Sequence, residues 1–198
     1  MRLGILLSGR GSNFEAIAEN IRSGRLNCEI GFVFSNRRNA PGLARAREMG
    51  FACAAIEPAG RERAAFDAEV AALLKQNGIE LVCLAGYMRL LSAEFIAQFP
   101  ERILNIHPSL LPAFPGLDAQ YQALMHGVKV AGCTVHFVDE NLDAGPILLQ
   151  AVVPVMDDDT ADSLSERILV EEHRIYSEAI AWVASGNYRI AGRRVIRT

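Results

Sequence analysis

The sequence lacks the features that mark membrane-embedded and secreted proteins. No apolar run approaches the roughly 20 residues that a membrane-spanning helix needs. The apolar stretch at residues 3–7 is too short for the core of a secretory signal, and Gly9 and Arg10 interrupt it. We therefore expect a cytoplasmic protein without membrane contact.

An excess of charge of one sign is also missing. The 198 residues carry 20 basic and 23 acidic side chains, for a net charge of −3. General binding to nucleic acid or to an anionic membrane surface draws on a basic excess, which this chain does not have. The expected partners are small molecules, and local phosphate recognition stays open because it needs only a few well-placed donors.

Cysteine is scarce and widely spaced. The four cysteines, none of which forms a CxxC pair, are Cys28, Cys53, Cys83 and Cys133. Three of them lie in or beside apolar runs, where a buried reduced thiol is usual, so we expect a reducing cytosol and no structural metal. His107 and His136 are candidate metal ligands, but no cluster of His, Cys and acidic residues has metal-like spacing.

Up to residue 100, short apolar runs alternate with helical patterns. Strands are expected at residues 3–7, 26–35, 51–56 and 81–85, and helices at residues 14–21, 40–49, 61–77 and 92–99. Hydrophobic residues make up 51% of the chain, enough for one substantial core. This rhythm predicts an α/β fold with a Rossmann-like, doubly wound, mostly parallel sheet.

After Pro100 the rhythm changes. A strand ending near His107 leads into a loop with three prolines and then a short helix at residues 119–125. Long strands follow at residues 132–139 and 146–155 with no helix between them, which favours antiparallel pairing. A long helix capped near Thr160 and a small hairpin at residues 187–196 complete the pattern.

The first candidate for chemistry is Asn105-Ile106-His107-Pro108. Side chains alternate along a strand, so Asn105 and His107 should share a face with their Cα atoms about 6–7 Å apart. Pro108 favours an extended residue before it and lacks a backbone donor, so His107 should end the strand. Ligands gather at the carboxyl ends of strands in open α/β sheets. The alternative is a buried histidine with a purely structural hydrogen bond.

A second candidate is the loop Gly9-Arg10-Gly11-Ser12-Asn13 between a strand and a helix. A dinucleotide fingerprint would need a third glycine where Phe14 stands, and no acid follows the second strand; a P-loop lysine is also missing. A phosphate nest remains, with Ser12 or Asn13 capping the helix. The alternative is a tight turn without a ligand.

Asp143 lies in an irregular loop, Glu140-Asn141-Leu142-Asp143-Ala144-Gly145, before a strand. Acids in such loops are often turn formers. A proton-transferring histidine, however, benefits from a carboxylate that keeps it charged and aligned, and Asn, His and Asp together can stabilise an oxyanion and move a proton. Because Gly-x-Ser-x-Gly is absent, acyl transfer directly to an external nucleophile fits better than a covalent acyl-enzyme.

At this point the chain resembles the folate-dependent formyltransferase family. The matching segments are residues 7–13, 34–36, 84–92, 105–112 and 132–146, and the likeness runs from residue 5 to about residue 175. The Asn-x-His-Pro-Ser-Leu-Leu-Pro block carries most of the specificity. The resemblance implies one formyltransferase domain over residues 1–198, with a phosphate-binding half at 1–100 and a catalytic, folate-binding half at 101–198.

The resemblance also implies an activity and roles for individual residues. A formyl group would pass from 10-formyltetrahydrofolate, a co-substrate, to the amine of 5-phosphoribosylglycinamide in de novo purine biosynthesis, by a monomer or homodimer without metal. The implied catalytic residues are Asn105, His107 and Asp143. The implied ribonucleotide-binding residues are Gly11, Ser12, Asn13 and Glu172. The implied folate-binding residues are Arg63, Met88, Arg89, Leu90, Leu91, Asn105, Asp139, Glu140, Asn141, Leu142 and Asp143.

One segment departs from the family pattern. Residues 116–120 read Gly-Leu-Asp-Ala-Gln, where the family usually has a histidine, so no role of that histidine is carried over. The alternatives are a formyltetrahydrofolate hydrolase and an amino-sugar-nucleotide formyltransferase. A methionyl-tRNA formyltransferase is disfavoured because it would need a further RNA-binding domain, and the hydrolase usually has an additional N-terminal domain. A nucleotide-binding module without activity would not need Asn105, His107 and Asp143 together.

Overall fold

The computed structural model describes all 198 residues. The chain forms two compact units, Met1–Asn105 and Ile106–Thr198, and strand β5 (Ile103–His107) crosses the boundary between them. None of the helices combines the length and the apolar character that crossing a membrane requires.

The first unit is a parallel α/β arrangement. Its elements are β1 (Arg2–Leu7), α1 (Ser12–Arg22), β2 (Glu29–Ser35), α2 (Pro41–Glu48), β3 (Cys53–Ala55), α3 (Arg63–Gln76), β4 (Leu81–Leu84) and α4 (Ala93–Gln98). The strands follow the order β3-β2-β1-β4-β5, and each neighbouring pair is parallel. The carboxyl ends of these strands therefore meet at one edge, where the polar loops follow.

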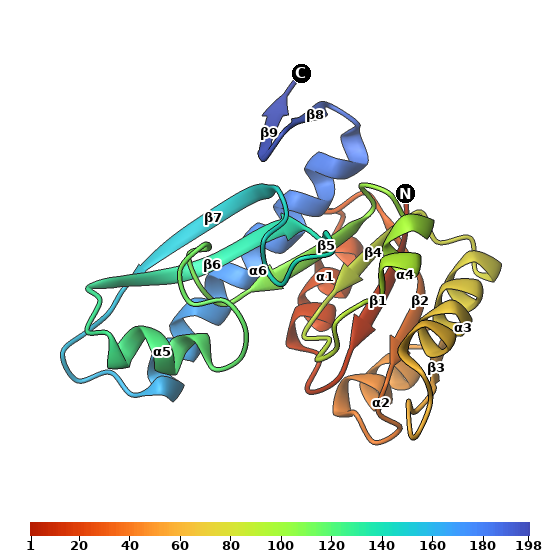
Figure 1. The fold of residues 1–198 in the computed structure, drawn as a ribbon, viewed down its shortest axis with the longest axis horizontal. Coiled ribbons are helices and arrows are strands. Elements are labelled where there is room, and N and C mark those ends of the chain that lie inside the picture. The colour runs from red at the N-terminus through yellow and green to blue at the C-terminus, as the bar shows by residue number, and fades with distance from the viewer. The chain divides into compact units, whose positions relative to one another are not determined.

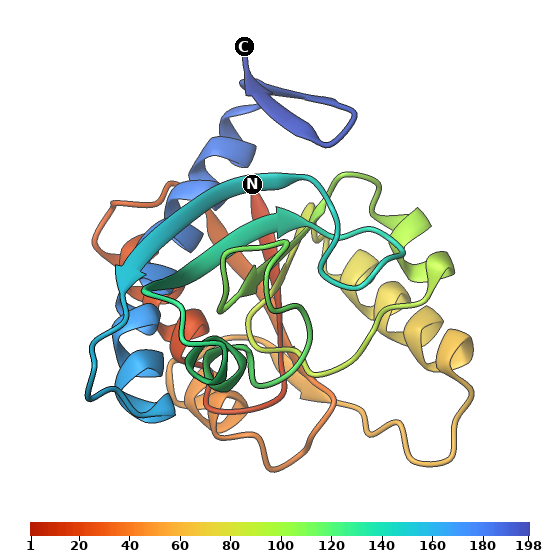
Figure 2. The ribbon, with the colours of Figure 1, turned by 60° about the vertical axis from the view of Figure 1, so that its left-hand side comes forward.

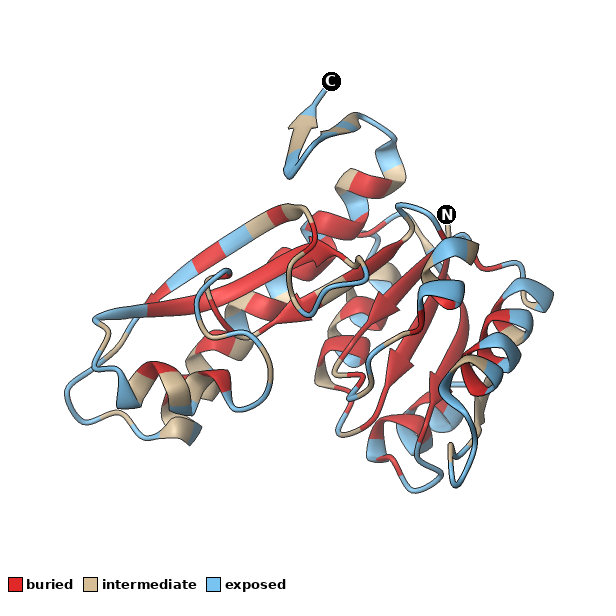
Figure 3. Ribbon diagram, in the orientation of Figure 1, coloured by how far each residue is buried: buried red, intermediate tan, exposed pale blue.

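Helices cover both faces of these strands. Helix α1 contacts α2, and α3 contacts α4, and the two pairs lie on opposite sides of the strands (Figure 1). The central strands β1, β2 and β4 are buried almost along their whole lengths (Figure 3). Burial on both faces explains why these segments read as continuous apolar runs rather than alternating ones.

The second unit is built on an antiparallel pair. Its elements are α5 (Ala119–Met125), β6 (Val130–Phe137), β7 (Ile147–Pro154), α6 (Ala161–Ser185), β8 (Tyr188–Ala191) and β9 (Arg194–Arg197). Strands β6 and β7 pair antiparallel over nearly their full lengths, and β7 continues through β9 to β8. Helix α6 packs along β6 and β7, and α5 contacts α6 (Figure 2).

The loop after β5 is fastened to the β6–β7 pair by hydrogen bonds. Leu111 N–H donates to Thr134 Oγ1 at 3.0 Å, and Thr134 Oγ1 donates to the Ser109 carbonyl at 2.7 Å. Gln150 Nε2 donates to the Leu111 carbonyl at 2.9 Å. The loop that follows His107 is therefore held against a rigid strand pair.

The expected fold class is confirmed: the sheet is mostly parallel with an antiparallel portion in the C-terminal half. Two expected strands are shorter than anticipated. The segment at 26–35 is strand only from Glu29, because Leu26 N–H turns back to the Asn20 carbonyl. The segment at 51–56 is strand only at Cys53–Ala55, since β3 is an edge strand with a single neighbour.

Candidate active site

His107 is the last residue of β5, as the following proline predicts. Its side chain is almost fully buried, and both ring nitrogens face oxygen atoms. Nε2 lies 2.9 Å from the main-chain oxygen of Phe114, and Nδ1 lies 3.4 Å from Asp143 Oδ2. The Phe114 carbonyl can only accept a hydrogen bond, so Nε2 is the donor in that contact, and Nδ1 faces the carboxylate.

Asp143 lies in the turn that joins β6 to β7. Its backbone has a φ of 48°, in the left-handed region that few residues other than glycine adopt. Its carboxylate accepts the Gly116 N–H at 2.8 Å through the same Oδ2 atom that faces His107. Asp143 thus joins the loop after β5 to the catalytic-site candidate His107, within the second unit.

His136 lies on the other side of Asp143. Its Nε2 is 3.8 Å from Asp143 Oδ1, and its Nδ1 is 2.8 Å from the Phe137 carbonyl oxygen. Burial lowers the pKa of His136, and the smaller opposing effects of the Phe137 carbonyl and the Asp143 charge do not offset it. Two imidazole rings, of His107 and His136, therefore flank one carboxylate.

Sequence reasoning considered His136 only as a metal ligand. The signal that could have placed it beside Asp143 is strand pairing, because His136 stands opposite Ile147 at the end of β6, next to the turn that holds Asp143. No group of three or more His, Cys, Asp or Glu side chains is arranged to hold a metal ion.

Asn105 is the last residue of the first unit and is half-buried. It pairs in parallel register with Leu84 of β4. It precedes His107 by two residues in the same strand, so the two side chains leave β5 on the same face.

The glycine loop is built as a tight strand-to-helix turn. Gly11, not Ser12 or Asn13, occupies the N-cap position of α1, so the expected side-chain cap is wrong. Gly11 has a φ of 83°, and a Cβ atom there would lie 2.7 Å from the Gly42 Cα. Two glycines thus let the starts of α1 and α2 approach closely, and Gly11 provides no side-chain cap for α1.

The structure brings this loop next to the run Met88–Leu91. The Ser8 N–H donates to the Gly86 carbonyl at 3.0 Å, and Met88 N–H donates to Ser8 Oγ at 2.8 Å. Met88 and Leu90 expose more than half of their surface. Exposed apolar side chains beside a polar turn suit a flat, partly apolar ligand.

Two buried anchors fix the Met88–Leu91 run in the first unit. Ser92 N–H donates to the buried carboxylate of Asp67 at 2.7 Å, and Arg89 lies over the Phe66 ring at 4.6 Å from its centroid. Burial, reinforced by the nearby Asp67 charge, raises the pKa of Tyr87 to a value far above its usual range. Arg63 is the exposed first residue of α3.

The remaining predicted residues belong to the second unit. Glu172 is buried on the side of α6 that faces β6, where burial and then the Glu172 charge raise the pKa of Cys133 to about 12. Asp139 accepts the Asn141 N–H at 2.8 Å and so shapes the turn toward Asp143, while Glu140, Asn141 and Leu142 are exposed.

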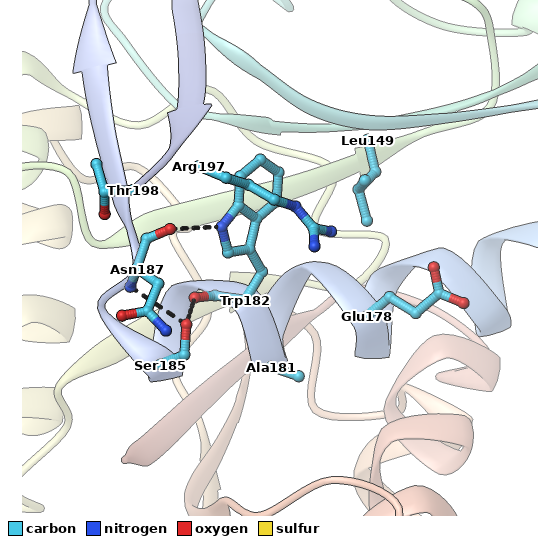
Figure 4. Close-up of a pocket in the computed structure, with 8 residues that line it drawn as sticks. All are labelled: Leu149, Glu178, Ala181, Trp182, Ser185, Asn187, Arg197 and Thr198. Atoms are coloured by element: carbon cyan, nitrogen blue, oxygen red, sulfur yellow. Dashed lines mark hydrogen bonds between the residues drawn. The ribbon is translucent and has the colours of Figure 1, made fainter.

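Two cavities lie in the second unit. The smaller, of about 220 Å³, borders Asp143 between apolar side chains that include Leu111, Pro115 and Leu142. The larger, of about 510 Å³, lies between the end of α6 and the C-terminal hairpin β8–β9, where Trp182 and Arg197 face it (Figure 4). Trp182 Nε1 donates to the Asn187 carbonyl at 3.0 Å, and the Arg197 guanidinium lies over the indole. These contacts between residues that line the larger cavity hold the hairpin against α6.

Comparison with known proteins identifies the family of the chain. The family model described as formyl transferase matches residues 1–180. The phosphoribosylglycinamide formyltransferase of Escherichia coli (strain K12) is 41% identical over 191 residues, covering 96% of this chain and 90% of the relative. The chain belongs to the formyl transferase family.

Further relatives extend this similarity. The crystal structure of glycinamide ribonucleotide transformylase 1 from Symbiobacterium toebii matches with a TM-score of 0.98 and 56% identity, covering 100% of this chain and 93% of that chain. The trifunctional purine biosynthetic protein adenosine-3 of Homo sapiens is 43% identical over 96% of this chain, which spans 19% of that relative's length. The family resemblance inferred from the sequence is therefore confirmed.

Sequence reasoning missed Phe114 as well as His136. The contact of Phe114 with His107 is made by a main-chain oxygen, so the identity of the residue gives no sign of it. The only available signal was the density of prolines around residue 114, which predicts a rigid loop without saying where its carbonyl groups point.

Proposed function

We propose that this member of the formyl transferase family transfers the formyl group of 10-formyltetrahydrofolate to the amine of 5-phosphoribosylglycinamide, in de novo purine biosynthesis. The observation that carries the proposal is the buried pair of His107 and Asp143, with Nδ1 and Oδ2 3.4 Å apart. An imidazole buried beside a carboxylate suits a group that stabilises an oxyanion and returns a proton.

The reaction would begin when the glycinamide nitrogen attacks the formyl carbon. The carbonyl π electrons move to the formyl oxygen, and the resulting tetrahedral oxyanion is stabilised by the Asn105 amide and the His107 imidazolium. Asp143 would align the His107 ring through its contact with Nδ1. Collapse of the intermediate breaks the bond to folate N10, and the proton lost by the amine reaches N10, through water.

The ribonucleotide phosphate would bind at Gly11, Ser12 and Asn13, where α1 begins and presents its positive dipole end. Glu172 would accept hydrogen bonds from the ribose hydroxyls. These assignments rest on the family likeness together with the tight turn at Gly11.

The folate would bind against Met88, Arg89, Leu90 and Leu91, with Arg63 as a further contact, and against Asp139, Glu140, Asn141 and Leu142. Exposed Met88, Leu90 and Leu142 supply apolar surface for the pterin and benzoyl rings. The near-neutral charge balance of the chain suits two small substrates, and we place the reaction in the cytoplasm.

The decisive assay offers 10-formyltetrahydrofolate with each of three acceptors: 5-phosphoribosylglycinamide, water alone and an amino-sugar nucleotide. We expect formyl transfer to the glycinamide ribonucleotide only, with formate release in water slower by several orders of magnitude. Rapid formate release without an acceptor would assign the chain to the hydrolases instead. Transfer to the amino sugar alone would assign it to another acceptor class.

A further inference from the structure

We propose that His126 is a positioning residue, whose imidazole ring holds Phe114 so that the Phe114 carbonyl fixes the ring of His107. The proposal rests on the proposed function, because its kinetic readout is formyl transfer. It concerns the second unit alone, where all three residues lie.

The contact of Phe114 with His107 is the shorter of the two contacts that hold the imidazole. Phe114 O is 2.9 Å from Nε2, within hydrogen-bonding distance, whereas Asp143 Oδ2 is 3.4 Å from Nδ1. A hydrogen bond is more directional than a longer ionic contact. The Phe114 carbonyl therefore determines the plane of the ring and keeps a proton on Nε2, which leaves Nδ1 as the nitrogen that Asp143 and a reacting group share.

The backbone of Phe114, which directs this carbonyl, has an unfavourable conformation. Phe114 has a φ of 53°, in the left-handed region that residues other than glycine seldom adopt. Neighbouring prolines restrict the loop, and Ser109 Oγ donates to the Ala113 carbonyl at 2.5 Å, which fixes the residue before Phe114. The residues after Phe114 are held as well, because Gln122 Nε2 donates to the Pro115 carbonyl at 3.3 Å and Gly116 N–H donates to Asp143 at 2.8 Å. The Phe114 side chain adds a further contact that supports its own strained conformation.

That contact is with His126. The two ring centroids are 5.1 Å apart, with the planes tilted by 55°, a separation at which aromatic rings attract one another. His126 is itself fixed, as the C-cap of α5, with Nδ1 2.9 Å from the Gln122 carbonyl oxygen. Its ring position is thus set by the last turn of the helix, and the helix supports the Phe114 ring through it.

The kinetic test compares His126→Ala, His126→Phe and the control Tyr121→Ala, which removes an exposed aromatic ring from the same helix. We expect His126→Ala to lower kcat about three- to ten-fold, the size that loss of one aromatic pair gives, with KM for both substrates unchanged. His126→Phe keeps an aromatic ring against Phe114 but lacks the Nδ1 contact with Gln122, so it should recover kcat in part, to a value between those of wild type and His126→Ala. Tyr121→Ala should leave kcat unchanged.

A second measurement separates positioning from a general effect on the loop. In a His107→Ala background, the additional change His126→Ala should not lower the residual rate further, because His126 acts through His107. A further drop there, a raised KM, or failure of His126→Phe to recover kcat would overturn the proposal.

An NMR measurement keeps the proposal testable if the formyl acceptor proves to be different. In ¹⁵N-histidine-labelled protein, the Nε2–H signal of His107 should be protected from exchange in the wild type and in Tyr121→Ala. It should shift and exchange faster in His126→Ala. An unchanged signal in His126→Ala would overturn the positioning role, whereas absence of formyl transfer by the wild type would overturn the proposed function only.

Discussion

Asp143 combines a left-handed backbone with a nearly buried carboxylate, and its contacts link His107 to the Gly116 N–H. Asparagine tolerates the left-handed region well and keeps an oxygen that can accept from Gly116. The change Asp143→Asn therefore removes the charge while preserving the turn. It isolates the electrostatic role of the carboxylate from its role in the backbone.

We expect Asp143→Asn to lower kcat at least about 10²-fold, the usual cost of weakening oxyanion stabilisation, with little change in the affinity for folate. His107→Ala should behave in the same way. Steady-state kinetics and calorimetric titration of the folate measure the two effects separately. The matched control is Asp157→Asn, which neutralises an exposed carboxylate; turnover of Asp143→Asn equal to that control would contradict the assignment.

At the scale of elements, the β6–β7 pair depends on a close approach at Gly132. A Cβ atom there would lie 1.9 Å from the Ala151 carbonyl oxygen and 2.8 Å from Leu110 Cδ2. The first neighbour is the backbone of the paired strand, so it cannot move aside without breaking the ladder. The second belongs to the loop that follows His107.

Gly132→Ala should therefore lower the free energy of unfolding by about 1–3 kcal/mol, as overpacking does in rigid interiors. Urea denaturation measures the change. The matched control is Gly9→Ala, where an added Cβ meets nothing within 4 Å, and it should differ from wild type by less than about 0.5 kcal/mol. Equal stability of the two variants would show that the strands can separate without cost.

The elements also show how far the sequence alone could reach. Apolar runs predicted β1, β2 and β4, Pro108 predicted the end of β5, and the lack of a helix between residues 139 and 146 predicted the antiparallel pair. Each of these follows from a local pattern. The N-cap at Gly11 did not follow, because the approach of Gly42, about 30 residues away, decides it.

The same distinction applies to the candidate site. His107 and Asp143 were both predicted, but their 3.4 Å separation, the carbonyl of Phe114 and the neighbouring His136 were not. These contacts join strand, turn and loop through main-chain atoms or strand register. Such contacts cannot be predicted from the types of the residues alone.

At the scale of the whole molecule, two groups make stability depend on pH. Burial holds the pKa of His136 below its ordinary value near 6.5, so the unfolded chain binds a proton there that the folded chain does not. Stability contributed by His136 is therefore complete above about pH 6.5 and declines as the pH falls below it. The change His136→Gln should make the stability of the protein depend less on pH below about 6.5.

Asp159 makes stability depend on pH in a lower pH range than His136 does. The Arg167 guanidinium, with Nη1 at 2.7 Å and Nη2 at 2.9 Å, and the Met156 N–H hold the pKa of Asp159 far below its usual range. Its contribution is present above the ordinary carboxyl value near pH 4 and is lost as the pH falls toward the folded value. Asp159→Asn should have a lower melting temperature than wild type at pH 7, and the difference should shrink toward pH 2. Thermal melts across the pH range measure both windows, and a constant difference would contradict the assignment.

Trp182, the single tryptophan of the chain, gives these experiments an optical probe. Its indole donates to Asn187 and lies 4.7 Å beneath the Arg197 guanidinium, so its surroundings change when the hairpin β8–β9 leaves helix α6. Intrinsic fluorescence therefore follows the C-terminal hairpin rather than the chemistry at His107. Deletion of residues 188–198 should shift the emission to longer wavelength and increase quenching by iodide while far-UV circular dichroism changes little. A denaturation curve followed at 295 nm excitation would then report this hairpin, and its divergence from the dichroism curve would reveal that the hairpin detaches before the rest of the protein unfolds.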